Sequence, residues 1–160
     1  MDDIITAIEE ILTAETGSGG DLEDFSITKE ENEIPKDAVK VVVISPVDEE
    51  FIENVKASYE IVKGSLFLTV MVKVDKSVVN RYQAASKSAR QEAAAVRKVV
   101  YASPTLVSTT FPNGLVCDDN YTRITRQLYG YGAEDGVWYA WARLSFSTKY
   151  IYRNGIITLQ

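Results

Sequence analysis

The chain has 160 residues, of which 46% are hydrophobic and 25% are charged, as in an ordinary globular domain. It contains no histidine and one cysteine, Cys117, which excludes Ser-His-Asp and Cys-His nucleophiles and metal sites built from four cysteines. The net charge of −6 divides unevenly: residues 1–60 hold 17 acidic residues against 4 lysines, and residues 61–160 hold 6 acidic residues against 13 lysines and arginines. This asymmetry suits a protein that contacts copies of itself or a neighbour head to tail, and it equally suits a solvated acidic region before an ordinary domain.

A single domain over residues 1–160 is expected from this length, with long loops at residues 17–38 and 103–120. No apolar run approaches the roughly 18 residues that a membrane helix needs, so we expect no membrane partner. The acidic start of the chain lacks the positive region of a signal peptide, and a lone cysteine forms no internal disulfide. These features predict residence in a reducing cytoplasm, or in a particle assembled there.

The first predicted element is an amphipathic helix over residues 2–15, in which apolar side chains recur at helical spacing: Ile4, Ile5, Ile8, Ile11 and Leu12. The glycines among residues 17–20 end it. They do not form a phosphate-binding loop, because no Gly-Lys-Ser/Thr follows and the preceding element is a helix. The polar segment 17–38 predicts an extended stretch with a short strand near Phe25–Thr28.

Two strands are expected next. Residues 39–45 (VKVVVIS) form a β-branched run that predicts a largely buried strand ending at Pro46. An acidic loop is then expected over residues 47–56; its carboxylates suit a solvated loop better than a Ca²⁺ site, which draws spaced oxygens from a turn rich in Gly and Asn. These carboxylates belong to Asp48, Glu49, Glu50 and Glu53. Residues 58–74 predict a long strand, continuous or broken near Gly64, with one alternating face in the core: Leu66, Leu68, Val70, Val72 and Val74.

The clearest helix is predicted over residues 77–101, where an alanine-rich stripe repeats at three- and four-residue steps: Val78, Tyr82, Ala85, Ala89, Ala93, Val96 and Val100. Basic residues lie off this stripe and face solvent: Lys87, Arg90, Arg97 and Lys98. Three explanations fit this basic face, namely a contact with acidic residues of a neighbouring subunit, nucleic acid, or plain solvation. The sequence pI of about 4.8 disfavours a dedicated nucleic-acid binder.

The last third predicts two strands, at residues 121–128 and 137–152, joined by a hairpin loop over residues 129–136, and a short apolar stretch at 156–159. One face of the longer strand is expected in the core: Trp138, Ala140, Ala142, Leu144, Phe146 and Tyr150. The opposite face carries Val137, Tyr139, Trp141 and Arg143. The order of elements predicts an α+β fold, a mostly antiparallel sheet of four to five strands with two helices packed on one face.

Aromatic residues near the predicted hairpin are the candidates for partner contact. No helix covers the reverse face in this layout, so Tyr139 and Trp141 need cover from a partner protein or from the acidic N-terminal segment. Tyr129 and Tyr131 alternate with glycines, which predicts either an adaptable partner-facing loop or an ordinary hairpin tip.

The element order also resembles a known family. An N-terminal amphipathic helix, an irregular segment, a short Val-rich strand, a long strand at residues 66–74 and a helix at 77–101 precede two closing strands. The last of these ends in an aromatic-x-Tyr-Arg pattern, Tyr150-Ile151-Tyr152-Arg153. This layout resembles the tail terminator (tail completion) proteins of tailed bacteriophages, and the related head–tail joining proteins.

The resemblance implies a virion protein of the tail or neck, assembled in the host cytoplasm. Such a protein forms a ring, usually a homohexamer, that caps the tail tube, ends its polymerisation and joins it to the head connector or stopper protein. DNA passes through the lumen without specific binding. The activity needs no catalytic residue, cofactor or metal, and none is predicted. It needs two complementary lateral surfaces, for which we pair the acids at 48–50 and Glu53 of one subunit with Arg90, Arg97 and Lys98 of the next.

Two other functions fit the same sequence. One is a head–tail adaptor or another tube- or sheath-associated virion protein, which the same fold would serve. The other is a monomeric ligand-binding domain with an aromatic pocket built from Trp138, Tyr139 and Trp141. An enzyme is least supported. A carboxylate pair such as Asp118 and Asp119 could act as acid and base, but adjacent residues on a loop are weak evidence for a catalytic site.

Overall fold

A computed structural model describes residues 1–29, 34–35, 37–56, 59–116, 123–134, 136–153 and 156–157. The fold is α+β, as the sequence predicts. The elements in chain order are α1 (Asp2–Ala14), β1 (Phe25–Thr28), β2 (Lys40–Lys56), β3 (Tyr59–Lys73), α2 (Arg81–Ala102), β4 (Arg123–Glu134), β5 (Val137–Arg153) and β6 (Ile156–Ile157).

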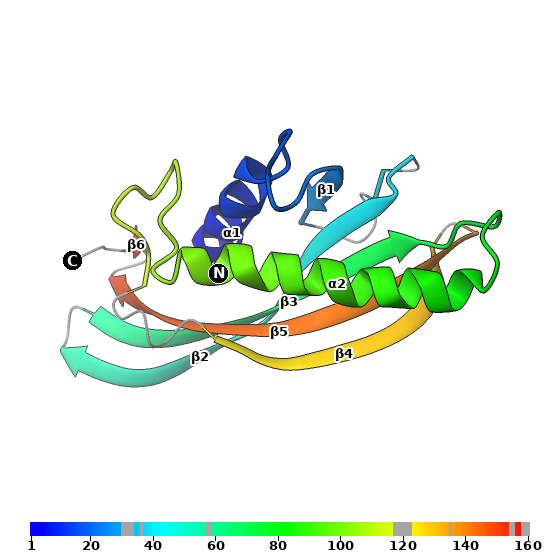
Figure 1. Ribbon diagram of the computed structural model, residues 1–160. Coiled ribbons are helices and arrows are strands. Elements are labelled where there is room, and N and C mark those ends of the chain that lie inside the picture. Colours follow the sequence, from blue (N-terminus) through cyan, green and yellow to red (C-terminus); the bar gives the residue numbers. More distant parts are fainter. Residues whose placement is uncertain are drawn as a thin grey trace.

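The strands form one open sheet in the order β1-β2-β3-β5-β4, and β6 pairs with the end of β5. Among the strands that the structure describes, β1 and β2 are parallel and the other paired strands are antiparallel. Both helices lie on the same side of this sheet (Figure 1), where α2 packs on β3, β4 and β5 while α1 contacts α2, β1 and β2. This arrangement confirms the predicted layout of two helices on one face.

The main core lies between the helices and the sheet because each element presents its apolar stripe there. From α1, Ile4, Ile8 and Leu12 are fully buried. The small side chains Ala85 and Ala89 let α2 approach the sheet, where they pack against Val72, Val74 and Ala140. The predicted core face of β3 is buried throughout, and the strand runs past Gly64 without a break.

The acidic loop predicted over residues 47–56 is wrong, because β2 continues to Lys56 and pairs with β3 along its length. Pro46 does not end the strand. The neighbouring strand β1 stops opposite Val43, so Pro46 lies on an edge, where the missing N–H costs no hydrogen bond within the sheet. A shift of register between Pro46 and Asp48 accommodates it.

The predicted loop at residues 129–136 is also wrong in extent, since β4 runs to Glu134 and β5 begins at Val137. Alternating tyrosine and glycine form a strand here, not a mobile tip. Tyr129 and Tyr131 pair with Ala142 and Ala140 and therefore share their face, the one that α2 covers.

Two further corrections concern the start of α2 and the face of Trp138. The helix begins at Arg81, four residues later than predicted, because Asn80 adopts a left-handed conformation and Ser77 donates hydrogen bonds to the Asp75 carboxylate. The Trp138 side chain lies on the helix side but is 47% exposed. The stripe residues Val78 and Tyr82 are exposed as well, so the core ends before this end of the sheet.

Candidate interaction surfaces

An acidic strip, defined as Asp48, Glu49 and Glu50, lies on the outer half of β2. All three residues are exposed. Glu50 and Asp48 share the face away from the helices, where Glu50 pairs with Lys63 at 3.5 Å. Glu53 follows in the same strand opposite Ile61, and its side chain is outside the described part of the chain.

Glu49 faces the helices and is held by two groups. The α-amino group of Met1 lies 2.5 Å from its Oε1, and the Tyr150 hydroxyl donates a hydrogen bond to the same oxygen. Partial burial raises the pKa of Glu49, but the hydrogen bonds from Met1 and Tyr150 and the ammonium charge outweigh it, so the pKa is lowered overall. Glu49 thus fastens the start of α1 to the sheet.

We expect Glu49→Gln to reduce the free energy of unfolding at neutral pH by less than about 1 kcal/mol, because the side chain is partly exposed. A carboxylate with a lowered pKa stabilises the fold above the ordinary glutamate pKa of about 4.3 and loses this contribution as the pH falls through the folded-state pKa. Urea unfolding at several pH values should therefore show the variant and the parent converging in acid. A difference that stays constant or grows in acid would contradict this account, and Asp48→Asn serves as the control.

The basic residues predicted to meet the acidic strip are exposed on α2, but two of them have contacts within the chain. Lys98 forms an ion pair with Asp21 at 2.7 Å. Arg90 lies 5.6 Å from the ring centroid of Tyr129 and donates hydrogen bonds to Ser86. Arg97 forms no ion pair with any residue in the described ranges.

A second set of basic residues lies on β4, at the opposite edge of the sheet. The register places Asp48 opposite Ser65, Ser65 opposite Ser147, and Ser147 opposite Arg123. Asp48 and Arg123 therefore stand at the two ends of one row across four strands. Arg126 lies on the same edge two pairs further along, opposite Ser145, and is exposed. Sequence reasoning missed these arginines, because only the pairing of β4 with β5 makes β4 an edge.

The two outer edges are open in the part of the sheet that the structure describes. On one side, β1 pairs only with residues 40–43 of β2, which leaves the strand beyond Val43 with a neighbour on the β3 side alone. On the other side, β4 pairs with β5 alone. The sheet thus ends in an acidic edge at Asp48 and a basic edge at Arg126.

The aromatic residues predicted to face a partner separate into two groups. Tyr129 and Tyr131 are 50% and 46% exposed on the helix side. The Tyr131 hydroxyl donates a hydrogen bond to the backbone carbonyl of Tyr82, and the two rings meet edge to face at 5.7 Å. These contacts join β4 to the first turn of α2.

Tyr139 and Trp141 lie on the reverse face as predicted, but Tyr139 does not face a partner, since the chain itself leaves only 2% of it exposed. Trp141 is half-buried against the Gly130 backbone, which leaves room for the indole ring. On the same face Ile34 packs against Val41 and Val43. The segment before β2 thus covers part of the reverse face. This is the second of the two predicted kinds of cover, the one that needs no partner protein.

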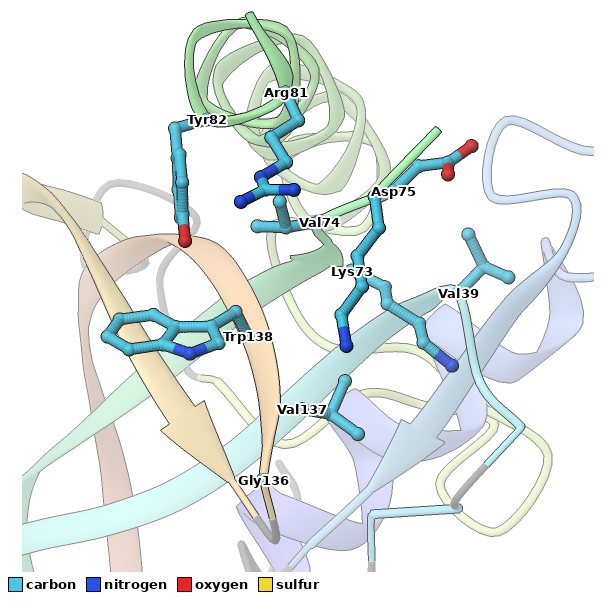
Figure 2. Close-up of a pocket in the computed structure, with 10 residues that line it drawn as sticks. Val39, Lys73, Val74, Asp75, Arg81, Tyr82, Gly136, Val137 and Trp138 are labelled. Carbon is cyan, nitrogen blue, oxygen red and sulfur yellow. The ribbon is translucent and has the colours of Figure 1, made fainter. Parts of the chain in front are cut away.

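A cleft of about 760 Å³ opens at the end of the sheet where α2 begins, β3 ends and β5 starts. Figure 2 shows the side chains of Tyr82 and Trp138 on one side of it and those of Lys73 and Val39 on the other, with Arg81 between them. Tyr82 and Trp138 meet edge to face with ring centroids 6.2 Å apart. No sequence motif predicts this cleft, because its walls come from four separate segments of the chain.

Other predicted groups give no site in the described residues. Cys117, Asp118 and Asp119 lie outside them. Within them, no three histidine, cysteine or acidic residues lie together as metal ligands would. Neither helix of the described chain has the length and apolar character needed to cross a membrane.

Comparison of the chain with protein-family models gives no match, and comparison with curated proteins gives none either.

Proposed function

We propose that this protein is a structural component of a phage virion that forms a ring on the end of the tail tube, stops its polymerisation and joins it to the head connector. The layout of helices and strands that resembles the tail terminator proteins supports this proposal. The single observation that carries it is the pair of oppositely charged open edges of one sheet, since every subunit of a closed ring needs two different, complementary surfaces.

The directions of the strands allow the edges to meet. Because β2, β3, β5 and β4 are antiparallel in succession, β4 runs opposite to β2. When two copies stand side by side in the same orientation, β4 of one copy lies antiparallel beside β2 of the next, and backbone hydrogen bonds can continue the sheet between subunits.

Charge selects this contact and sets its register. Asp48 and Arg123 end the same row of the sheet, so side-by-side copies bring Asp48 level with Arg123 of the neighbour. Arg126 ends the row of Ser45, two pairs along on the same face, from where its long side chain reaches toward Asp48. Such pairs affect register and encounter rate more than affinity, while burial and backbone pairing supply the affinity. The exposed face of α2, with Arg90 and Arg97, is the other basic surface for the strip.

Charge reversal at the two edges tests the proposal. We expect Asp48→Lys and Arg126→Glu each to prevent ring formation, and the double variant to restore it, because the reversed charges again attract one another. The mass of the assembly, alone and in the presence of tail tubes, is measured by analytical ultracentrifugation. Arg97→Glu is the matched control on α2 and should leave the ring intact.

Each outcome has a clear meaning. Loss of the ring in Arg97→Glu but not in Arg126→Glu would move the contact to the face of α2. Rings that form regardless of all three changes would reject charge pairing altogether. Electron microscopy of intact particles that carry the labelled protein tests its location in the virion. We expect a ring at the junction of tail and head. A single copy at another location would contradict the proposed function.

A further inference from the structure

The cleft at the end of the sheet is a binding site in its own right, separate from the two edges. Its walls are the end of β3 (Lys73) with the following residues Val74, Asp75 and Lys76, the start of α2 (Arg81, Tyr82), and the start of β5 with the preceding glycine (Gly136, Val137, Trp138); Val39 completes it. Its volume of about 760 Å³ lies within the range of sites that enclose a ligand or a short peptide segment. The acidic strip lies near the other end of β3, where Glu50 pairs with Lys63.

The charge of the cleft is positive. Among the described residues that line it, Lys73, Lys76 and Arg81 are basic and Asp75 alone is acidic. The Asp75 carboxylate accepts hydrogen bonds from the backbone and side chain of Ser77. These hydrogen bonds lower the pKa of Asp75, so it stays ionised and offsets one of the three cations. A ligand that enters the cleft therefore meets an excess of positive charge, which favours carboxylates or phosphates.

The rim of the cleft is apolar and unusually exposed. Trp138 is 47% exposed, Tyr82 is 40% exposed and Val39 is 56% exposed. Beside them, at the turn before α2, Val79 is 86% exposed. Exposed aromatic and aliphatic side chains gathered around a few cations are typical of protein-binding surfaces, where aromatic residues anchor the contact.

We propose that this cleft binds a peptide segment of another protein in which carboxylates flank an apolar side chain. The carboxylates would pair with Lys73, Lys76 and Arg81, and the apolar side chain would pack on Trp138 and Tyr82. A nucleic acid fits less well, because the valines of the rim offer nothing to a phosphate backbone and the acidic chain as a whole repels it. The acidic strip of a second copy fits less well too, because the proposed ring contact uses Asp48 at the edge of the sheet and Glu49 and Glu50 are held within their own subunit.

The binding of an acidic, apolar peptide by this cleft does not depend on ring formation. The identity of the protein that supplies the peptide rests on the proposed function. If copies join through the edges of their sheets, the cleft lies at the strand ends, away from both joined edges, and stays open to a protein that stacks on the ring. The peptide then belongs to a protein stacked on the ring.

A fluorescence titration tests the site. The chain has two tryptophans, so Trp141→Phe leaves Trp138 as the only one and makes its emission report on the cleft. The probes are synthetic peptides with aspartate and glutamate around one phenylalanine or leucine, matched peptides with asparagine and glutamine, matched peptides with serine in place of the apolar residue, and an oligothymidylate. Lys73→Glu and Arg81→Glu remove the positive charge, and Arg97→Glu, at the other end of α2, is the control.

We expect saturable binding of the acidic, apolar peptides only. Reversal of Lys73 or Arg81 should weaken it by about tenfold or more, since each charged pair contributes on the order of one decade of affinity, and Arg97→Glu should not change it. No saturable binding by any acidic peptide, or tighter binding of the oligothymidylate, would overturn the proposal, as would equal loss in the control. These results leave ring formation untouched, so failure here is distinguishable from failure of the proposed function.

Discussion

Replacing Phe146 with alanine is expected to lower the free energy of unfolding by about 3–5 kcal/mol, the usual cost of removing a large aromatic side chain from a packed core. Phe146 is 1% exposed and lies on β5 between Leu66 on β3 and Ile124 on β4. Its ring belongs to the core cluster that joins both helices to the sheet. The cavity left by alanine would therefore weaken the packing of both helices on the sheet.

Trp138→Ala is the matched control for Phe146→Ala, because Trp138 lies on the same strand and the same face. It is 47% exposed, so its truncation should cost less than about 1 kcal/mol. Urea unfolding of both variants gives the comparison. A larger loss for Trp138→Ala than for Phe146→Ala would mean that the core extends to the end of the sheet, as the alternation of β5 alone predicts.

Gly130→Ala is expected to destabilise the fold by about 1–3 kcal/mol, the range for overfilling a packed site. A β-carbon at this position would collide with the indole ring of Trp141, which occupies the space above the glycine. Relief requires Trp141 to leave its place on the reverse face of the sheet. The glycine is therefore needed for close packing, not for the mobility that a loop would have.

Gly132→Ala provides the control for Gly130→Ala on the same strand and face. Its β-carbon would lie 3.8 Å from the nearest atom of Trp141, an ordinary contact. Since alanine is preferred over glycine within a strand by roughly 0.5–1 kcal/mol, this change should be neutral or slightly stabilising. Thermal unfolding separates the two, and equal losses would show that the contact with Trp141 does not determine the cost.

The sequence predicted the elements whose apolar periodicity is unambiguous. The helix at residues 2–15, the strand near Phe25–Thr28 and the buried face of residues 58–74 are all confirmed. Each of these elements has a local pattern of apolar side chains that must be buried in any fold, so it can be predicted without knowing which strands or helices pack against it.

The errors arose where pairing with a distant strand decides the structure. The charges of residues 47–56 indicated a loop, but β3 supplies a partner for the whole of β2, and the side chains at 48–50 are exposed on an edge where charge is tolerated. The glycines at 130 and 132 indicated a mobile turn, but they lie in a strand opposite Trp141 and Tyr139, and the Trp141 ring fills the space above Gly130. The periodicity of apolar residues and the local composition do not reveal which residues lie opposite each other on paired strands.

The candidate surfaces were predicted in part. The acidic strip and the basic side of α2 follow from sequence because charge and helical spacing place them on the exterior. The basic edge of β4 and the cleft do not, because they depend on which strand ends the sheet and on four chain segments that meet at Trp138.

The most direct test of edge pairing is a mixture of the two single reversal variants, Asp48→Lys and Arg126→Glu, measured by native mass spectrometry. In either variant alone, the residues at positions 48 and 126 carry the same sign of charge, so every contact between two copies is repulsive and the protein should remain monomeric. In the mixture, the reversed strip of one variant meets the reversed edge of the other, so we expect heteromeric species that contain both variants. Species composed of one variant only, or no association at all under conditions where the parent protein forms rings, would contradict the account.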